Sequence, residues 1–305
     1  MAHPSAGLKP SSVLFVACFL WGAATVLNKQ LLGPISPIAL LVVQLLPGVA
    51  LFVLLTLVSG RSFPKGRNFA FAAFLGLLNP GISYSLSMLG LERISASVAS
   101  LMWATEPIMI LAMAWFFLGE TSTRMLFAIV AIGLAGVMLV VGLLGELTAL
   151  RIDLLGVALL FGAVFLCAIY TVFSRRMTNE VDPIPLLAVQ QGAGLAWALA
   201  LLAATADRGL TSALTDVPAN SLLIGTITGF MYYGLSYWLY LYALRALPAA
   251  IAGAYFNVIP LVTIALAFAF LGERLSLLQW FGAALIFVSA ALLFREAVKR
   301  ETAAP

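Results

Sequence analysis

The sequence predicts an all-α integral membrane protein with ten transmembrane helices, arranged as two inverted five-helix repeats around a central cavity. Three observations support this fold class. The chain of 305 residues is 63% hydrophobic and 9% charged, with a mean hydropathy of +1.10, whereas a soluble domain is about 25% charged. Apolar segments of about 20 residues recur along the chain, each long enough to cross roughly 30 Å of hydrocarbon. The two halves of the chain also resemble each other.

Ten segments have the length and hydropathy of a membrane-spanning helix. In chain order they are Ser11–Leu32, Pro37–Val58, Phe69–Leu91, Ile94–Leu118, Met125–Leu144, Leu154–Phe173, Ile184–Thr205, Ser221–Leu244, Ala249–Leu271 and Leu277–Phe294. The connections between them are short, the longest being Gly145–Asp153 and Asp207–Asn220, so no soluble domain fits between helices. The activity is therefore expected inside the bilayer.

The two halves of the chain are related by an internal repeat. A gapless shift of 153 residues matches parts of the third and fourth segments with parts of the eighth and ninth. The matched residues are Gly81, Ser83, Tyr84, Leu86 and Phe117–Glu120 (FLGE) with Gly234, Ser236, Tyr237, Leu239 and Phe270–Glu273 (FLGE). We therefore expect one membrane domain, with a first five-helix repeat at residues 1–146 and a second at residues 147–305.

The number of helices in each repeat determines how the repeats are oriented. Because five is odd, the second repeat enters the membrane from the opposite side and the repeats are inverted. Inverted repeats are characteristic of transporters, whose substrate site lies near the midplane between the repeats. The repeat also predicts that the first segment is a retained helix rather than a signal peptide, since its counterpart in the second half cannot be a signal.

Basic residues predict the orientation of the chain in the membrane. If the N-terminus is cytoplasmic, eleven of the 16 Lys and Arg residues fall in inner segments, which satisfies the positive-inside rule with both termini inside. The net charge of +4 therefore indicates topology and gives no support to a nucleic-acid partner. Cys18 and Cys167 lie within spans and are expected to pack rather than form a disulfide. With His3 as the single histidine, we expect neither a metal site nor a cofactor.

Three sequence features together resemble a known family. They are the "WG" of Trp21 and Gly22, a proline in the middle of the fourth and ninth segments, and "LGE" at the end of each of these segments. The pattern resembles the EamA branch of the drug/metabolite transporter superfamily, and within it most closely the YddG-type exporters of aromatic and other amino acids. The resemblance covers nearly the whole chain and implies an exporter of metabolites in the bacterial inner membrane. It does not specify the substrate.

Glu106 is the acidic residue placed deepest in a predicted span. Counted along the helix, it lies about 18 Å from either end of the fourth segment. A carboxylate at that depth costs about 3 kcal/mol on insertion scales, so it is expected to face the protein interior or a water-filled cavity. Its repeat counterpart is Ile259, which indicates a role specific to one half of the chain. That role is either contact with substrate or coupling, or else a hydrogen bond within a helix kink.

Pro107 and its repeat counterpart Pro260 are expected to break the fourth and ninth helices. Each removes a backbone donor and crowds the carbonyl four residues earlier, and broken helices in transporters use such freed backbone groups to hold substrates. An amino-acid zwitterion would match both polarities. We expect its ammonium near the carbonyls of Trp103 or Phe256, together with Glu106. The groups expected to hold its carboxylate are amides at a helix break or the side chains of Gln44, Gln190 and Asn257.

Aromatic residues are expected to line the cavity. Phe230, Tyr233, Tyr237 and Tyr240 are spaced by three and four along the eighth segment and share one helical face, and Tyr84 is the counterpart of Tyr237. With Trp103 they form walls suited to flat or apolar side chains. Gln44 and Gln190 also recur between repeats, either as cavity wall or as partners in interhelical hydrogen bonds.

The sequence therefore predicts a secondary transporter that exports small amphipathic or zwitterionic metabolites, including aromatic amino acids, by alternating access. An enzyme is not expected, because the chain has no HExxH motif, no mid-membrane histidine and a single deep acid. Two alternatives stay open: a proton-coupled exporter of drugs or cations that uses Glu106, and a passive channel or scramblase. The partners expected are the substrate and the lipid bilayer, and a monomer is compatible with the sequence.

Overall fold

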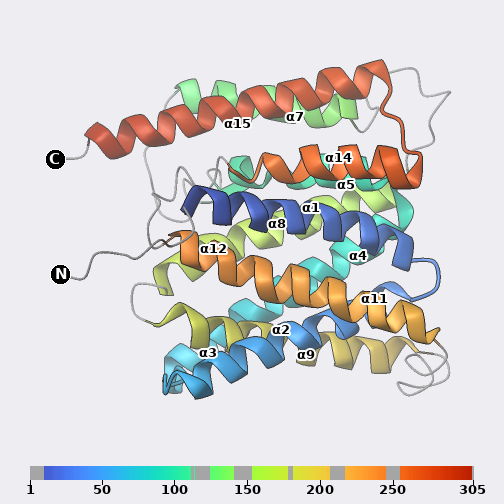
Figure 1. Ribbon diagram of the computed structural model, residues 1–305. Helices are drawn as coiled ribbons and strands as arrows, with labels where there is room; N and C mark the ends of the chain where they lie inside the picture. The colour runs from blue at the N-terminus through green and yellow to red at the C-terminus, as the bar shows by residue number, and fades with distance from the viewer. Residues whose placement is uncertain are drawn as a thin grey trace.

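The computed structural model describes residues 10–110, 113, 124–140, 153–177, 181–206, 217–244 and 255–303. All regular structure in these ranges is helical, and the helices lie side by side in one bundle (Figure 1). In chain order they are α1 (Pro10–Leu31), α2 (Pro37–Val58), α3 (Gly66–Gly76), η1 (Leu77–Ile82), α4 (Ser83–Arg93), α5 (Ala96–Trp103), α7 (Arg124–Val140), α8 (Leu154–Met177), α9 (Pro183–Thr205), α11 (Ala219–Gly229), η2 (Phe230–Leu235), α12 (Ser236–Leu244), α14 (Val258–Leu271) and α15 (Leu277–Ala303).

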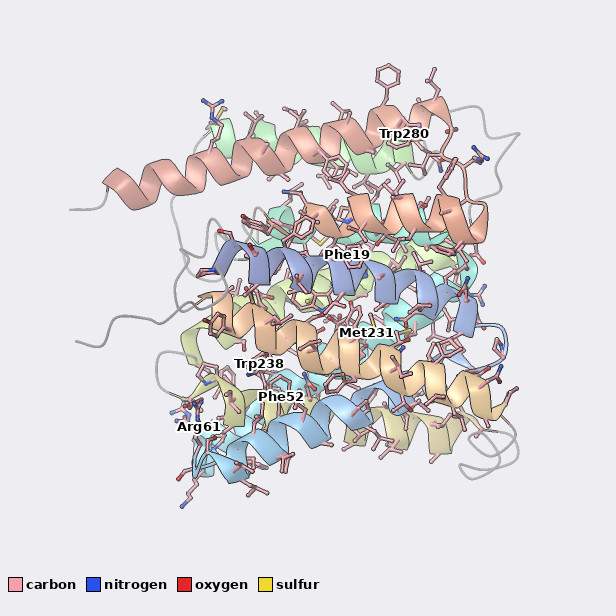
Figure 2. All side chains as sticks on the ribbon, viewed as in Figure 1. Phe19, Phe52, Arg61, Met231, Trp238 and Trp280 are labelled. Carbon is pink, nitrogen blue, oxygen red and sulfur yellow. The ribbon has the colours of Figure 1, made fainter. Side chains whose placement is uncertain are left out.

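The bundle has the dimensions and surface of a membrane protein. Five stretches of the described chain are long and apolar enough to cross a bilayer, namely Pro10–Leu31, Pro37–Val58, Gly66–Arg93, Leu154–Ser174 and Pro183–Thr205. Large apolar side chains lie exposed on the outside of the bundle, among them Phe19, Trp238 and Trp280 (Figure 2). An apolar outer surface of this kind is suited to contact with lipid.

Several helix bounds agree with the predicted spans to within one residue. α2 begins and ends at the predicted residues, α1 is displaced by one residue at each end, and α9 begins one residue earlier than predicted. α15 differs more, because it continues to Ala303, past the predicted end at Phe294. The described residues leave out parts of the fourth, fifth and ninth predicted spans. They also leave out the predicted connection Gly145–Asp153, except for its last residue. α1 begins and α15 ends at the same end of the bundle, on the left in Figure 1. This arrangement is consistent with an even number of crossings.

The third helix of each repeat is interrupted by a π-helical segment. In the first repeat α3 is followed by η1 and α4, and in the second repeat α11 is followed by η2 and α12. Each element of the second repeat begins 153 residues after its counterpart in the first, which is the shift of the sequence repeat. In η1, Asn79 leaves the helical region with φ −149° and ψ 121°. π-Helical turns inside α-helices are frequent at functional sites. The sequence analysis did not predict either interruption.

Corresponding helices of the two repeats pack in corresponding ways. α2 contacts α9 and α7 contacts α15, while α4 packs on α8 as α12 packs on α1. Two glycines allow the closest crossings: a Cβ on Gly76 would lie 2.2 Å from the carbonyl oxygen of Gln190, and a Cβ on Gly229 would lie 2.4 Å from that of Gln44. The third helix of each repeat therefore touches the backbone of the second helix of the other repeat.

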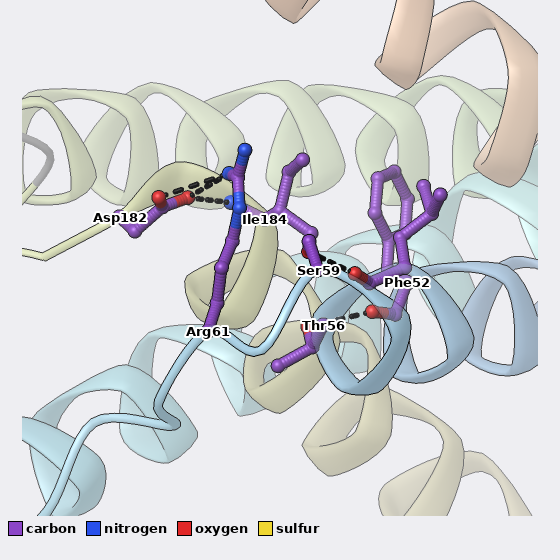
Figure 3. Close-up of polar contacts among 7 residues, drawn as sticks. Phe52, Thr56, Ser59, Arg61, Asp182 and Ile184 are labelled. Carbon is purple, nitrogen blue, oxygen red and sulfur yellow. Dashed lines mark hydrogen bonds and ion pairs between the residues drawn. The ribbon is translucent and has the colours of Figure 1, made fainter.

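Polar contacts join the repeats at both ends of the bundle. At the end where α2 finishes, Arg61 donates to both carboxylate oxygens of Asp182 at 2.7 and 2.9 Å (Figure 3). At the opposite end, Glu273 accepts from the backbone of Ala96 at 2.7 Å and of Ser97 at 2.9 Å, and from the Ser97 hydroxyl at 2.6 Å. The Glu273 carboxylate thus caps the N-terminus of α5, a favourable place for a negative charge.

A second ion pair lies at the Glu273 end. Arg93, the last residue of α4, donates to Asp153 at 2.9 Å, and Asp153 also accepts from the backbone of Gly156 at the start of α8. The hydrogen bond from Arg93 and the bond from Gly156 hold the pKa of Asp153 below its ordinary value. Each end of the bundle thus has one ion pair between the repeats among the described residues, and this end also has the hydrogen bonds to Glu273.

Candidate functional site in the centre of the bundle

Aromatic side chains of both repeats meet in the centre of the bundle. Tyr84 stacks on Trp103 with ring centroids 5.8 Å apart, and it meets Tyr232 and Tyr233 edge-on at 5.7 and 5.3 Å. The hydroxyl of Tyr84 lies 3.1 Å from that of Tyr237, its counterpart in the other repeat. This symmetric pair of hydroxyls therefore marks the interface between the repeats.

Trp21 extends the same group of rings. Its ring lies edge-on to Tyr237, Tyr240 and Phe256, with centroids 5.4 to 5.9 Å apart, and its indole N–H donates to the carbonyl oxygen of Tyr232 at 3.1 Å. We call these eight side chains the aromatic cluster: Trp21, Tyr84, Trp103, Tyr232, Tyr233, Tyr237, Tyr240 and Phe256. Edge-to-face and offset pairs of this kind stabilise a packed group beyond simple area burial.

The "WG" motif has a structural explanation in this region. While Trp21 reaches η2, the adjacent Gly22 lies against α14, where a Cβ would come within 2.9 Å of the carbonyl oxygen of Ile259. The hydroxyl of Thr263 on α14 also donates to the carbonyl oxygen of Gly22 at 3.2 Å. Phe230, predicted to share a face with the tyrosines, is instead exposed on the outside, because the π-helical turn of η2 changes the helical register.

Glu106 lies where the fourth helix is interrupted. α5 ends at Trp103, a turn covers residues 104–105, and helix resumes at Glu106. Its carboxylate accepts from the Cys167 thiol at 3.4 Å and from the Thr171 hydroxyl at 3.5 Å, both on α8 of the second repeat. The Thr171 distance lies at the long end of the range for hydroxyl donors, and a thiol is a weak donor. The carboxylate therefore faces the interface between the repeats and is held only loosely.

A polar stripe on α8 links Glu106 to Gln190. Cys167, Tyr170, Thr171 and Ser174 are spaced as i, i+3, i+4 and i+7, so they share one helical face. Tyr170 donates to Gln190 at 2.8 Å, and Gln190 donates to Ser174 at 3.0 Å. The sequence analysis missed this stripe and treated Cys167 only as a packing residue. The spacing of these four residues along the sequence could have indicated the stripe. Cys18 and Cys167 are both free thiols.

The two repeated glutamines make corresponding hydrogen bonds. Gln44 donates to Asn28 at 2.5 Å and Gln190 to Ser174 at 3.0 Å, and each partner lies 16 residues earlier on the first helix of the same repeat. Gln44 is fully buried, and its backbone lies against Gly229. Gln190, by contrast, also borders a central cavity. The structure therefore places Gln44 in an interhelical hydrogen bond and Gln190 at the cavity wall.

The predicted prolines lie just after the observed breaks. Pro107 is the second residue of the helix that resumes at Glu106, and Pro260 lies in the first turn of α14, after a turn at Phe256 and Asn257. A proline in a first turn leaves no intrahelical hydrogen bond unmade, because the first N–H groups of a helix have no partner within it. Trp103, at the end of α5, donates to the Ser87 hydroxyl at 3.2 Å.

The centre holds a small cavity rather than an open chamber. Its polar lining comes from η1, α8, α9, η2 and α12, in the form of Asn79, Tyr170, Gln190, Gln191, Tyr233 and Tyr237. The centre of a water-sized sphere can move within a volume of about 10 Å³ in this cavity. The cavity therefore has room for about one water molecule. The expected substrate-sized cavity is therefore closed in this conformation within the described part of the chain, because the aromatic cluster packs across it.

A duplicated helical bundle with a buried polar and aromatic site between its halves defines a membrane transporter rather than an enzyme. The family model of the EamA-like transporter family matches the chain twice, over residues 9–142 and 154–295. The chain therefore belongs to the EamA-like transporter family, within the drug/metabolite transporter superfamily. Its architecture is the all-helical, ten-helix membrane fold of that family, built from two repeats.

Sequence relatives agree with this assignment, and one solved structure shares the fold. The chain is 25% identical to a chloroplastic WAT1-related protein of Arabidopsis thaliana, covering 92% of this chain and 68% of the relative. It is 25% identical to the uncharacterized transporter YvbV of Bacillus subtilis (93% and 91% covered). The uncharacterized inner membrane transporter YedA of Escherichia coli is 24% identical (92% and 89% covered). One crystal structure superposes with a TM-score of 0.63 at 20% identity, covering 97% of this chain and 99% of that chain.

Proposed function

We propose that this protein exports small amphipathic metabolites, chiefly amino acids including aromatic ones, from the cytoplasm across the bacterial inner membrane by alternating access. The observation that carries the proposal is the aromatic cluster, which spans the interface of the two repeats and adjoins neutral polar groups and one carboxylate. Aromatic walls bind flat or apolar side chains by stacking and area burial. This substrate class is the one expected of a YddG-type exporter.

The charge of the site supports a neutral or zwitterionic substrate. Carriers of phosphorylated metabolites need Lys or Arg at mid-depth to meet phosphate, and the sequence places none in the middle of a predicted span. Lys29, near the end of α1, donates to the backbone carbonyls of Leu91 and Glu92 at 2.6 and 3.0 Å. It therefore stabilises the C-terminus of α4.

Alternating access is supported by how the repeats are joined. We propose repeat boundaries at residues 146 and 147, with both termini in the cytoplasm, which places the Glu273 contacts and the Arg93–Asp153 pair on the periplasmic side. The Arg61–Asp182 pair then lies on the cytoplasmic side. Movement of one repeat against the other about the glycine crossings at Gly76 and Gly229 would open one end while the other stays closed.

The experiment that tests this function uses the purified protein in liposomes. Uptake of labelled phenylalanine is measured with unlabelled amino acids as competitors, with and without an imposed pH gradient. We expect saturable uptake that other amino acids inhibit, and a response to the gradient only if protons are coupled. Empty liposomes and liposomes that carry a Trp103→Ala variant are the controls. Uptake equal to that of empty liposomes would refute the amino-acid assignment.

A second candidate function is export of lipophilic cations in exchange for protons. The loosely held carboxylate of Glu106 favours it, because a weakly bonded acid beside an aromatic wall can attract a cationic drug. The Glu106→Gln variant separates the two functions. Loss of lipophilic-cation transport with phenylalanine uptake retained would support the second candidate, and the reverse result would support the first.

A further inference from the structure

Three buried polar atoms beside the central cavity lack a partner in the protein. Within the described residues, Asn79 Oδ1, Gln191 Oε1 and the Tyr233 hydroxyl make no hydrogen bond, and each of these residues is at most 2% exposed. All three residues line the cavity. Leaving a buried polar group unpaired costs about 1–3 kcal/mol, so three such groups around one space indicate that the space is built to receive a polar group.

The chemistry of these atoms limits what they receive. Gln191 donates through Nε2 to the carbonyl oxygen of Tyr233 at 2.9 Å, which fixes its amide and leaves Oε1 as the unpaired acceptor. Two amide oxygens and one hydroxyl oxygen form a neutral set of electron-pair donors, the type of ligand that small monovalent cations prefer. The occupant is therefore a cation or a hydrogen-bond donor, and not an anion.

The surrounding backbone is shaped to hold this set in place. A Cβ on Gly48 of α2 would lie 2.6 Å from Gln191 Oε1, and a Cβ on Gly194 of α9 would lie 2.6 Å from Pro80. These glycines let the helices approach until the cavity holds about one water-sized group. Asn79 also lies at the non-helical position of η1, and interrupted helices at mid-membrane are where transporters coordinate ions.

The carboxyl group of Glu106 lies further along the same face of α8. Tyr170 borders the cavity, and the α8 stripe carries Tyr170 next to Cys167 and Thr171, which contact the Glu106 carboxylate. An ionised Glu106 would favour a positive charge nearby, because Coulomb attraction is weakly screened inside a protein. The neutral oxygens would replace the hydration shell, while the carboxylate would balance the charge.

We propose that the cavity between η1, α9 and η2 binds one small monovalent cationic group through Asn79, Gln191 and Tyr233. The group is either a free sodium ion or the ammonium of a transported metabolite, since both match neutral oxygen ligands in a space of this size. The sodium form is independent of the proposed function, whereas the ammonium form rests on it and places the substrate headgroup beside the aromatic cluster.

The first experiment measures thermal unfolding of the purified protein in detergent at constant ionic strength. The salts compared are sodium chloride, potassium chloride, methylammonium chloride and tetramethylammonium chloride, the last being a cation too large for the cavity and without N–H groups. At ten times its dissociation constant, a bound ion raises the midpoint by about 3 °C. We expect this shift with sodium or methylammonium and not with tetramethylammonium.

Matched variants assign the shift to the site. Tyr233→Phe removes one hydroxyl and keeps the ring, and Asn79→Asp adds a carboxylate among the ligands. We expect Tyr233→Phe to lose the ion-dependent shift and Asn79→Asp to show it at a lower ion concentration. Tyr242→Phe makes the same chemical change on the exposed face of α12 and is expected to behave like the wild type.

The outcomes separate this site from the proposed function. A shift with sodium identifies a free ion, and a shift with methylammonium but not sodium identifies the substrate's ammonium. Equal midpoints in all four salts, for the wild type and for Asn79→Asp, would overturn the proposal and leave a site for water. Failure of phenylalanine uptake with the sodium shift intact would refute the proposed function alone.

Discussion

At the scale of single residues, nearly every polar side chain in the centre of this protein has a defined partner. Gln44 bonds Asn28, Gln190 bonds Ser174 and Tyr170, and the hydroxyls of Tyr84 and Tyr237 bond each other. Five buried side-chain atoms have no partner among the described residues: Asn79 Oδ1, Gln191 Oε1 and the Tyr233 hydroxyl belong to residues that border the cavity, whereas Gln44 Oε1 and Trp197 Nε1 do not. Because unpaired polar groups are costly inside a membrane, we propose that the three gathered at one cavity mark where a transported or coupled species acts.

The Tyr84–Tyr237 pair gives a residue-scale prediction. Replacing either tyrosine by phenylalanine removes one hydrogen bond across the repeat interface, and we expect a loss of about 1 kcal/mol in the free energy of unfolding. The double variant should cost little more than one single variant, because both remove the same bond. Chemical unfolding in detergent of the four proteins in this cycle checks the prediction. Fully additive losses would show that the hydroxyls do not interact.

The crossing glycines give a second prediction at this scale. A Cβ on Gly76 would lie 2.2 Å from the carbonyl oxygen of Gln190, a fixed backbone atom. We therefore expect Gly76→Ala to lower the free energy of unfolding by about 1–3 kcal/mol and to reduce the yield of folded protein. Gly192→Ala, two residues after Gln190 on α9 and with nothing within 4 Å of its added Cβ, is the matched control. Equal stability of the two variants would contradict the observed crossing.

At the scale of secondary-structure elements, the interrupted helices meet at the centre. η1 and η2 border the cavity together, and the break before Glu106 brings that residue against α8. Each interruption exposes backbone groups where a continuous helix would have none. The elements therefore create a polar site inside a bundle that exposes large apolar side chains on its outside.

Contacts at the ends of the elements give an element-scale prediction. Glu273 joins α14 to the N-terminus of α5, so Glu273→Ala should loosen that end of the bundle. In a background without native cysteines, we expect a cysteine in place of buried Val98 to react several-fold faster with a membrane-impermeant maleimide when Glu273 is removed. Glu92→Ala, at the same end, is the control. Unchanged reactivity would show that Glu273 does not help to close it.

Much of the fold could be predicted from the sequence, because hydropathy and length determine a membrane helix. The bounds of α2 and the repeat shift of 153 residues are examples. The cavity ligands could not be found in the same way. Pro80 gave a signal for η1, but η2 contains no proline, and Asn79 and Gln191 recur at no corresponding position in the other repeat. Their roles depend on packing between segments far apart in the chain.

Among the predicted site residues, the structure brings most together, and their roles in transport stay predictions. Tyr84, Trp103, Tyr233, Tyr237 and Phe256 belong to the aromatic cluster, and Glu106 and Gln190 are joined through the α8 stripe. Gln44 lies in a buried contact with Asn28, and Asn257 is half-buried at the start of α14. Repetition between the halves identified structural positions well, whereas the proposed cation ligands Asn79 and Gln191 lie at positions without a repeated counterpart.

At the scale of the whole molecule, the two repeats enclose a site that is closed in this conformation. In the proposed mechanism a substrate reaches the aromatic cluster when the repeats move apart at one end, and we propose that the polar contacts at the two ends determine which end opens. A passive channel would instead provide a continuous pore. Transport by this protein should therefore saturate and should show exchange between substrate on the two sides of the membrane.

Counterflow is the measurement that tests this account most directly. Proteoliposomes are loaded with unlabelled phenylalanine and diluted into a trace of labelled phenylalanine, so that no net gradient drives the label inward. We predict that label accumulates transiently inside the proteoliposomes above its equilibrium level. We expect this accumulation to disappear in the Trp103→Ala variant, which removes one ring of the aromatic cluster. Label that only equilibrates, at a rate proportional to concentration, would contradict a transporter with one alternately exposed amino-acid site.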